Sequence, residues 1–190
     1  QAEGKLRLTL VDHNAVSGSL AGLGDSVVEI VDHHMDLGEH AHVRGGLSRD
    51  IAFERQDGNG KPLVGSCCTL VAERMLEQAP DSLSSDVARL LLGVILLDTV
   101  NLDVDAKRAT QRDIAAAEQL TRRVAWLPPA SAKKSVDPAT VTAADKDPRC
   151  SPGAFFDALR NAKFDPVFWR GLSARDCLRY DYKQFVPDGA

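Results

Sequence analysis

The segment SVVEIVDHH, residues 26–34, begins as a short β-branched run and ends in three polar side chains of the metal-ligand type. The segment LRLTLVDHN, residues 6–14, likewise consists of a mostly apolar run followed by three polar side chains. Apolar runs with polar carboxyl ends are typical of buried parallel strands that border a site. Residues 15–25 are long enough for a short crossover helix between the two strands. The order strand, helix, strand predicts an α/β fold with a parallel sheet flanked by helices.

Further elements are predicted after residue 50. A strand is expected over 51–54, and helices are expected over about 67–78 and 86–98. The second of these helices is apolar on all sides, so we expect it to be buried. A capping box formed by Thr110 and Asp113 predicts a third helix that runs to about Val124.

A change in composition predicts the domain organisation. Residues 128–150 contain four prolines and few apolar side chains, which is typical of a linker or long loop. We therefore predict a first domain over 1–127 and the start of a smaller second α/β domain over 151–190. We expect the chain to be part of something longer, because a strand begins near Lys5 and no closing element follows Phe185.

Composition excludes several classes of protein. The 190 residues are 44% hydrophobic and 26% charged, as in an average soluble globular protein. The net charge of −4 leaves no basic surplus for nucleic acid, and no apolar run is long enough to span a membrane. The four cysteines have no disulfide or zinc-type spacing, so we expect reduced thiols in a cytoplasmic protein.

The strongest chemical signal is the pair of strand ends Asp12-His13-Asn14 and Asp32-His33-His34. Adjacent parallel strands would bring their carboxylates and imidazoles to one edge of the sheet, where α/β proteins bind ligands. Mixed oxygen and nitrogen donors suit Mn²⁺, Co²⁺, Fe²⁺ or Zn²⁺. A solvated polar loop or a helix cap is the alternative for each group alone. Asp98 ends an apolar helix and must be paired or bound to a cation, the alternative being a helix cap or salt bridge.

Three acids with nearby imidazoles fit a phosphoryl hydrolase that uses two metal ions. In such a site His34, if it is not a ligand, could hydrogen-bond a phosphate oxygen or the leaving group. Gly65 and Ser66 precede a helix and are candidates for contact with an anion, with a simple helix cap as the alternative.

Four motifs in order carry a resemblance to a known family. They are Asp12-His13-Asn14, Asp32-His33-His34, the stretch GSCCT at 65–69, and Leu97-Asp98-Thr99. Together they resemble the DHH phosphoesterase superfamily, and most of all its prune and exopolyphosphatase branch. Family II inorganic pyrophosphatases share the same motifs.

The resemblance implies a role for each matched position. Asp12 would bridge two divalent ions, Mn²⁺ or Mg²⁺, and His33 and Asp98 would be ligands of one of them. His34 would face the substrate phosphate, and Asp32 would orient the site. Lys183 would reach phosphate from the second domain.

The implied activity is hydrolysis of a phosphoanhydride, with short polyphosphate as the substrate and a metal-activated water as the nucleophile. A pyrophosphatase and a cyclic nucleotide phosphodiesterase are alternatives, as is an interaction scaffold that binds protein partners in a prune-like role. The family's first metal-binding motif has no counterpart before Gly4, and the second domain is incomplete. We therefore expect this chain alone to hold one of the two ions poorly and to have little or no activity.

Overall fold

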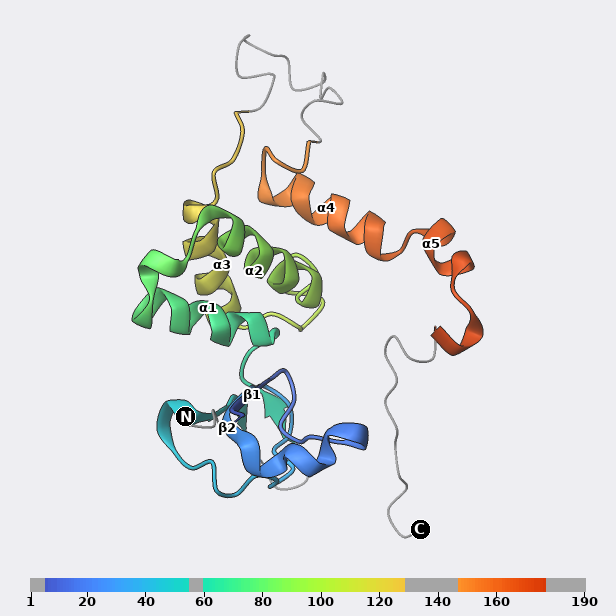
Figure 1. Cartoon of the computed structure of the whole chain (residues 1–190). Helices are drawn as coiled ribbons and strands as arrows, with labels where there is room; N and C mark the ends of the chain where they lie inside the picture. The colour runs from blue at the N-terminus through green and yellow to red at the C-terminus, as the bar shows by residue number, and fades with distance from the viewer. Residues whose placement is uncertain (1–5, 55–59, 129–146, 177–190) are drawn as a thin grey trace, which may run out of the picture.

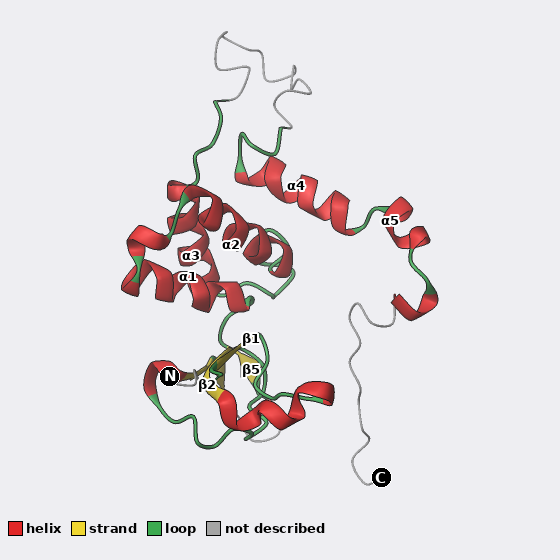
Figure 2. Ribbon diagram, viewed as in Figure 1, coloured by secondary structure: helices red, strands yellow, loops and turns green. Residues whose placement is uncertain are grey.

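A small parallel sheet organises the N-terminal part of the molecule. The computed structural model describes residues 6–54, 60–128 and 147–176. Its main sheet contains β1 (Leu8–Val11), β2 (Val27–Asp32) and β3 (Arg49–Ile51) in that spatial order, with parallel pairing throughout. Helices flank this sheet (Figures 1 and 2), which confirms the predicted α/β class.

The central strand β2 has apolar side chains packed on both of its faces. Ile30 contacts the cluster that contains Leu10 and Val43, whereas Val31 packs with Val64 and Leu70 on the helical side. The crossover from β1 to β2 is the 3₁₀ helix η1 (Gly18–Ser26), as expected for a connection that is short and rich in glycine.

The single strand predicted over 51–54 is in fact two short strands in different sheets. β3 ends at Ile51, and β4 (Phe53–Glu54) pairs antiparallel with β5 (Lys61–Pro62). The chain passes from one sheet to the other at the buried residue Ala52, which makes a backbone hydrogen bond toward each sheet. Its N–H donates to Asp32 O at 2.8 Å, and its carbonyl accepts from Leu63 N at 2.8 Å. A short 3₁₀ helix, η2 (Gly46–Ser48), precedes β3.

Three α-helices form the second layer of the molecule (Figure 1). They are α1 (Cys67–Gln78), α2 (Ser85–Asp98) and α3 (Gln111–Arg123), with the 3₁₀ helix η3 (Pro80–Ser82) after α1. The side chains of Ser66 and Ser84 cap α1 and α2, and the predicted capping box is present at the start of α3. Local capping signals therefore located these three helices to within one or two residues.

The prediction that α2 is buried on all sides is wrong. Leu90 is 71% exposed and Val94 is 41% exposed, while Leu92 and Ile95 are fully buried. The neighbouring helices cover only part of the circumference of α2, so an apolar stripe remains in contact with solvent.

Helix α4 (Pro152–Lys163) packs against α2, and α5 (Pro166–Gly171) follows it (Figure 1). Phe156 of α4 is 7% exposed and belongs to the same core cluster as α2 and α3. At Gly93 of α2 an added Cβ would lie 2.9 Å from Leu159 Cδ1, so α4 approaches closely. Helical structure resumes at 174–176, where Ser173 Oγ accepts from Asp176 N at 3.2 Å. The proposed division into domains at residues 128–150 stays a prediction. Among the described helices, none is long and apolar enough to cross a membrane.

Candidate metal centre

Asp12 lies at the carboxyl end of β1 in a left-handed backbone conformation. Its φ is 65°, and its N–H donates to Val31 O of the neighbouring strand at 3.0 Å. Aspartate is one of the few residue types that adopt this conformation readily. The backbone thereby turns out of the strand while the carboxylate stays beside the end of β2.

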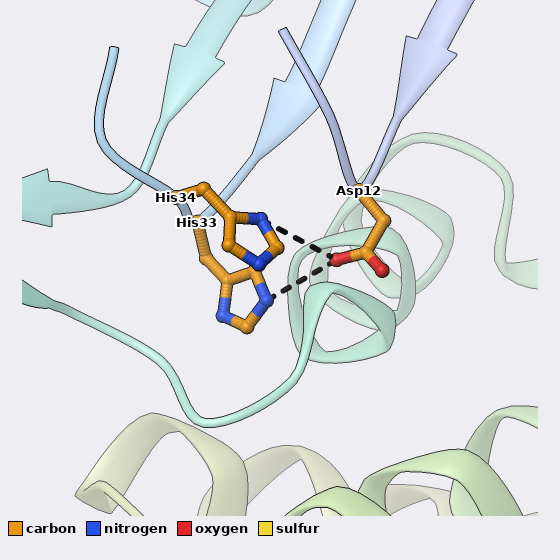
Figure 3. Close-up of side chains that lie close together, drawn as sticks. All are labelled: Asp12, His33 and His34. Atoms are coloured by element: carbon orange, nitrogen blue, oxygen red, sulfur yellow. Dashed lines mark ion pairs between the residues drawn. The ribbon is translucent and has the colours of Figure 1, made fainter. Parts of the chain in front are cut away.

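His33 and His34 follow β2, and both rings lie beside the Asp12 carboxylate (Figure 3). Asp12 Oδ1 is 3.2 Å from His33 Nε2 and 3.9 Å from His34 Nδ1. One potential ligand atom from each of the three residues lies within 4.8 Å of the other two. This metal cluster, meaning Asp12, His33 and His34, has the oxygen and nitrogen donors that divalent transition metals bind. Its donors therefore fit a divalent metal ion.

A backbone carbonyl orients the His33 ring. His33 Nδ1 lies 3.0 Å from Val64 O and therefore carries a proton. Nε2 faces Asp12 at 3.2 Å and would offer its lone pair to a metal ion after losing its own proton. An imidazole held in this way is a typical metal ligand.

Asp32 is fully buried, and its carboxylate is hydrogen-bonded to both histidines. Its Oδ1 accepts from His33 N at 2.7 Å, from His34 N at 3.2 Å and from His34 Nδ1 at 2.8 Å. Its Oδ2 accepts from Asn14 Nδ2 at 2.6 Å. All four donors are within the protein, so Asp32 acts on the site by positioning its neighbours.

Asn14 has a role that we did not predict. It is 3% exposed and, besides its bond to Asp32, donates to Met35 O at 3.0 Å and accepts from Leu37 N at 3.0 Å. These bonds tie the end of β1 to the loop after β2. Its amide, one of the few polar groups near a strand end that can both donate and accept, is the only sequence signal for this role.

Asp12 and His33 of the metal cluster shift each other's pKa. The hydrogen bond from His33 holds the pKa of Asp12 below its ordinary value, although partial burial acts in the opposite direction. Burial by itself would lower the pKa of His33, but the Asp12 and Val64 oxygens outweigh it and leave that pKa raised. A metal ion would have to compete with a proton for His33, so metal affinity should weaken in acid.

Asp98, the last residue of α2, lines the same cavity as the metal cluster. Its Oδ2 accepts a hydrogen bond from Ser66 Oγ at 2.7 Å. Its carboxylate is outside the group of three whose donor atoms lie within 4.8 Å of one another. The assignment of Asp98 as a metal ligand stays a prediction.

The N–H groups before α1, which were candidates for binding a substrate anion, bind the carboxylate of Asp113. Gly65 N and Ser66 N donate to the Asp113 carboxylate at 2.8 and 3.3 Å, and Ser66 Oγ caps the helix by accepting from Cys68 N. These N–H groups already have an acceptor, so their contact with a substrate anion stays a prediction.

Asp113 connects three segments, whereas the sequence indicated only its capping role. Its fully buried carboxylate accepts from Thr69 Oγ1 at 2.6 Å and from Thr110 N and Oγ1 at 2.7 Å, in addition to the two N–H groups before α1. Burial opposes ionisation, but these hydrogen bonds outweigh it and hold the pKa of Asp113 below its ordinary value. The loop at residues 64–66, which contributes Val64 and Gly65 to the lining of the cavity, is therefore anchored to α1 and α3.

The cavity above the metal cluster has a volume of about 560 Å³. Besides the metal cluster and Asp98, three basic residues line it: Lys61, Lys107 and Arg108. Lys183, predicted to contact phosphate, lies outside the described residues.

Comparison with known proteins agrees with this geometry. No family model matches the chain. The chain is 34% identical over 189 residues to the exopolyphosphatases PRUNE1 of Bos taurus and of Homo sapiens, covering 98% of this chain and 33% of each relative. It is 29% identical to a putative exopolyphosphatase of Schizosaccharomyces pombe, covering 95% of this chain and 39% of that protein. The chain thus spans about a third of the length of the relatives it matches. These similarities, together with the four motifs around the cavity, establish that the chain belongs to the DHH phosphoesterase superfamily, in its prune and exopolyphosphatase branch.

Proposed function

We propose that this chain carries the metal-binding part of a hydrolase that cleaves phosphoanhydride bonds, with short polyphosphate as its substrate. The observation that carries the proposal is the metal cluster at the carboxyl edge of the sheet, below a cavity with basic side chains. The names of the relatives support the choice of substrate, because each is called an exopolyphosphatase.

In this proposal Asp12 and His33 hold divalent ions, Mn²⁺ or Mg²⁺, and Asp98 is a further ligand. Bound ions of this kind lower the pKa of an attacking water and stabilise negative charge on phosphate oxygens. The protein supplies a fixed arrangement of donors, since Val64 O orients His33 and Ser66 Oγ restrains Asp98.

His34 is suited to contact the substrate. Its Nδ1 is bound by the buried Asp32 carboxylate, and its side chain is 50% exposed at the cavity. With Nδ1 hydrogen-bonded to Asp32, the Nε2 atom of His34 is the one left to contact a phosphate oxygen or the leaving group. This arrangement separates the role of His34 from that of His33, which faces Asp12.

Metal binding is the first test of the proposal. At a Mn²⁺ concentration of 100 times Kd, binding stabilises the folded chain by about 2.7 kcal/mol, which raises Tm by roughly 5–10 °C. Asp12→Ala should abolish this shift. His13→Ala is the matched control, because His13 is an exposed neighbour outside the metal cluster. Equal shifts in wild type and Asp12→Ala would contradict the assignment of the site.

The reaction is tested by release of phosphate from tripolyphosphate, pyrophosphate and a cyclic nucleotide in the presence of Mn²⁺. Because this chain alone is expected to have little or no activity, the assay compares it with a terminally extended chain. We expect the extended chain to release phosphate from tripolyphosphate, and Asp12→Ala in that chain should reduce the release by more than tenfold. Hydrolysis of the cyclic nucleotide alone would replace the proposed substrate class. Mn²⁺ binding with no release from any of the three by either chain would favour a binding scaffold.

A further inference from the structure

Three basic side chains share the cavity with the metal cluster, and two of them are unpaired. Lys61 forms an ion pair with Glu54 at 3.3 Å. Across the parts of the chain that the structure describes, the side chains of Lys107 and Arg108 form no hydrogen bond or ion pair, although Asp12 and Asp98 line the same cavity. Cations that face a cavity without a protein partner are available to an anionic ligand.

The loop that carries Lys107 and Arg108 has an unusual backbone. Val100, Asn101 and Leu102 have φ values of 53°, 59° and 60°, and Lys107 has a φ of 54°. Left-handed backbone is unfavourable for valine, leucine and lysine and persists in them only where the surrounding structure enforces it. The loop between α2 and α3 is therefore held in one specific conformation.

Contacts at both ends of this loop explain how that conformation is held. Thr99 is fully buried, donates from Oγ1 to Ile95 O at 2.6 Å and accepts from Leu102 N at 3.1 Å. At the other end, Arg108 O packs so closely on Gly65 that an added Cβ there would lie 2.1 Å away. The two cations are thus presented from a fixed backbone next to the site, which reduces the entropy lost on binding.

We propose that Lys107 and Arg108, together with Lys61, form an anion subsite that binds the phosphates of a polyphosphate chain behind the phosphate at the metal cluster. This inference rests on the proposed function and adds a subsite for the rest of the substrate. Arginine binds phosphate with two parallel hydrogen bonds, and lysine binds it as a point charge. Affinity at this subsite should therefore increase with the number of phosphates in the ligand.

The test measures binding without turnover. Calorimetry with an imido-bridged triphosphate, which resists hydrolysis, and with orthophosphate would compare wild type with the double variant Lys107→Gln/Arg108→Gln in Mn²⁺. We expect Kd for the triphosphate to rise at least tenfold and Kd for orthophosphate to change less than threefold. A change of less than twofold for the triphosphate would overturn the subsite.

The matched control removes two positive charges elsewhere. Arg122 of α3 and Lys163 of α4 are exposed and do not line the cavity. The variant Arg122→Gln/Lys163→Gln should bind the triphosphate within twofold of wild type. An equal loss in this control would attribute the effect to net charge and overturn the subsite. The conservative exchange Lys107→Arg/Arg108→Lys should retain binding within about threefold, and an unchanged Tm would show that the variants are folded.

Failure of this inference is distinguishable from failure of the proposed function. Binding that depends on Lys107 and Arg108, with no hydrolysis of a phosphoanhydride by the terminally extended chain, would retain the subsite and reject the reaction. Hydrolysis of tripolyphosphate with equal KM in wild type and Lys107→Gln/Arg108→Gln would retain the reaction and reject the subsite.

Discussion

The residues around the metal cluster divide into those that face the cavity and those that hold them. Both carboxylate oxygens of Asp32 accept hydrogen bonds from donors within the protein. His33 and His34 each use Nδ1 in a hydrogen bond to the protein and keep Nε2 for a metal ion or a substrate. This difference in hydrogen bonding allows two adjacent histidines to have different roles.

We predict that His33→Asn and His34→Asn affect different measurements. His33→Asn should weaken Mn²⁺ binding at least tenfold, because it removes the nitrogen that lies 3.2 Å from Asp12. In the terminally extended chain, His34→Asn should lower kcat by at least tenfold while Mn²⁺ affinity changes less than threefold. Metal titrations followed by Tm, together with phosphate release, separate the two effects. A greater loss of metal affinity in His34→Asn would make His34 a ligand.

The two adjacent cysteines are predicted to react slowly in the folded protein. Burial raises the pKa of Cys67 from 9.0 to about 12 and that of Cys68 to about 11. At pH 8 the thiolate fractions are on the order of 10⁻⁴ and 10⁻³, so alkylation should be slow until the chain unfolds. Peptide mass spectrometry after iodoacetamide treatment, with and without denaturant, would measure this. Equal rates in both conditions would contradict the buried environment.

The raised pKa values of Cys67 and Cys68 also make the free energy of unfolding depend on pH in alkaline solution. The folded state retains both thiol protons more strongly than the unfolded chain does. Their contribution is complete below pH 9 and is lost as the pH rises toward about 11 to 12.

At the scale of the elements, the junction of α1, α3 and the loop at residues 64–66 supports the site. The Asp113 carboxylate joins all three, and the same loop supplies the carbonyl that orients His33. A change at this junction should therefore affect both folding and the metal cluster.

We predict that Asp113→Asn destabilises the fold by about 2–4 kcal/mol, because an amide nitrogen would face donors that need an acceptor. Ionised Asp113 stabilises the fold above pH 3.8, and this contribution is lost as the pH falls through 3.8 toward the lower folded-state pKa. The difference in unfolding free energy between wild type and variant should therefore narrow from pH 6 to pH 3.

Asp103→Asn is the matched control for this experiment. Asp103 is exposed on the loop between α2 and α3 and accepts from Asp105 N at 2.9 Å. Denaturant unfolding at several pH values should give a change of less than about 1 kcal/mol for this variant. A pH-independent difference for Asp113→Asn would contradict the role of the buried charge.

At the scale of the whole molecule, α4 completes the helical core although a proline-containing segment separates it from α3 in sequence. Phe156 enters the core, and Phe155 meets the Trp126 ring edge-on with 6.2 Å between ring centroids. The helix therefore contributes to the stability of the preceding helices.

We predict that Phe156→Ala destabilises the chain by about 3 kcal/mol and lowers Tm by roughly 6–12 °C, through loss of buried aromatic surface. Phe164→Ala is the control, because Phe164 is 64% exposed. Mn²⁺ should still raise the Tm of both variants, since the metal cluster lies on the strands. An equal fall of Tm in the two variants would show that α4 does not stabilise the core.

Local sequence alone determined the first strands, the three helices of the second layer and the polar strand ends. Caps such as Ser66, Ser84 and Thr110 act on N–H groups a few residues away, and the alternation along β1 acts within one strand. The two strand-end motifs were also expected to meet, because the carboxyl ends of parallel strands lie at one edge, and Asp12 and His33 do lie together there.

Only the tertiary structure decided the features that depend on distant parts of the chain. The hydrogen bond from Gly65 to Asp113 joins residues 48 positions apart, and that from Asn14 to Asp32 joins residues 18 apart. The exposed stripe at Leu90 depends on how far neighbouring helices reach around α2. The approach of Arg108 to the metal cluster depends on the path of the loop over Gly65. Such contacts follow from packing geometry, which has no periodic signal in the sequence.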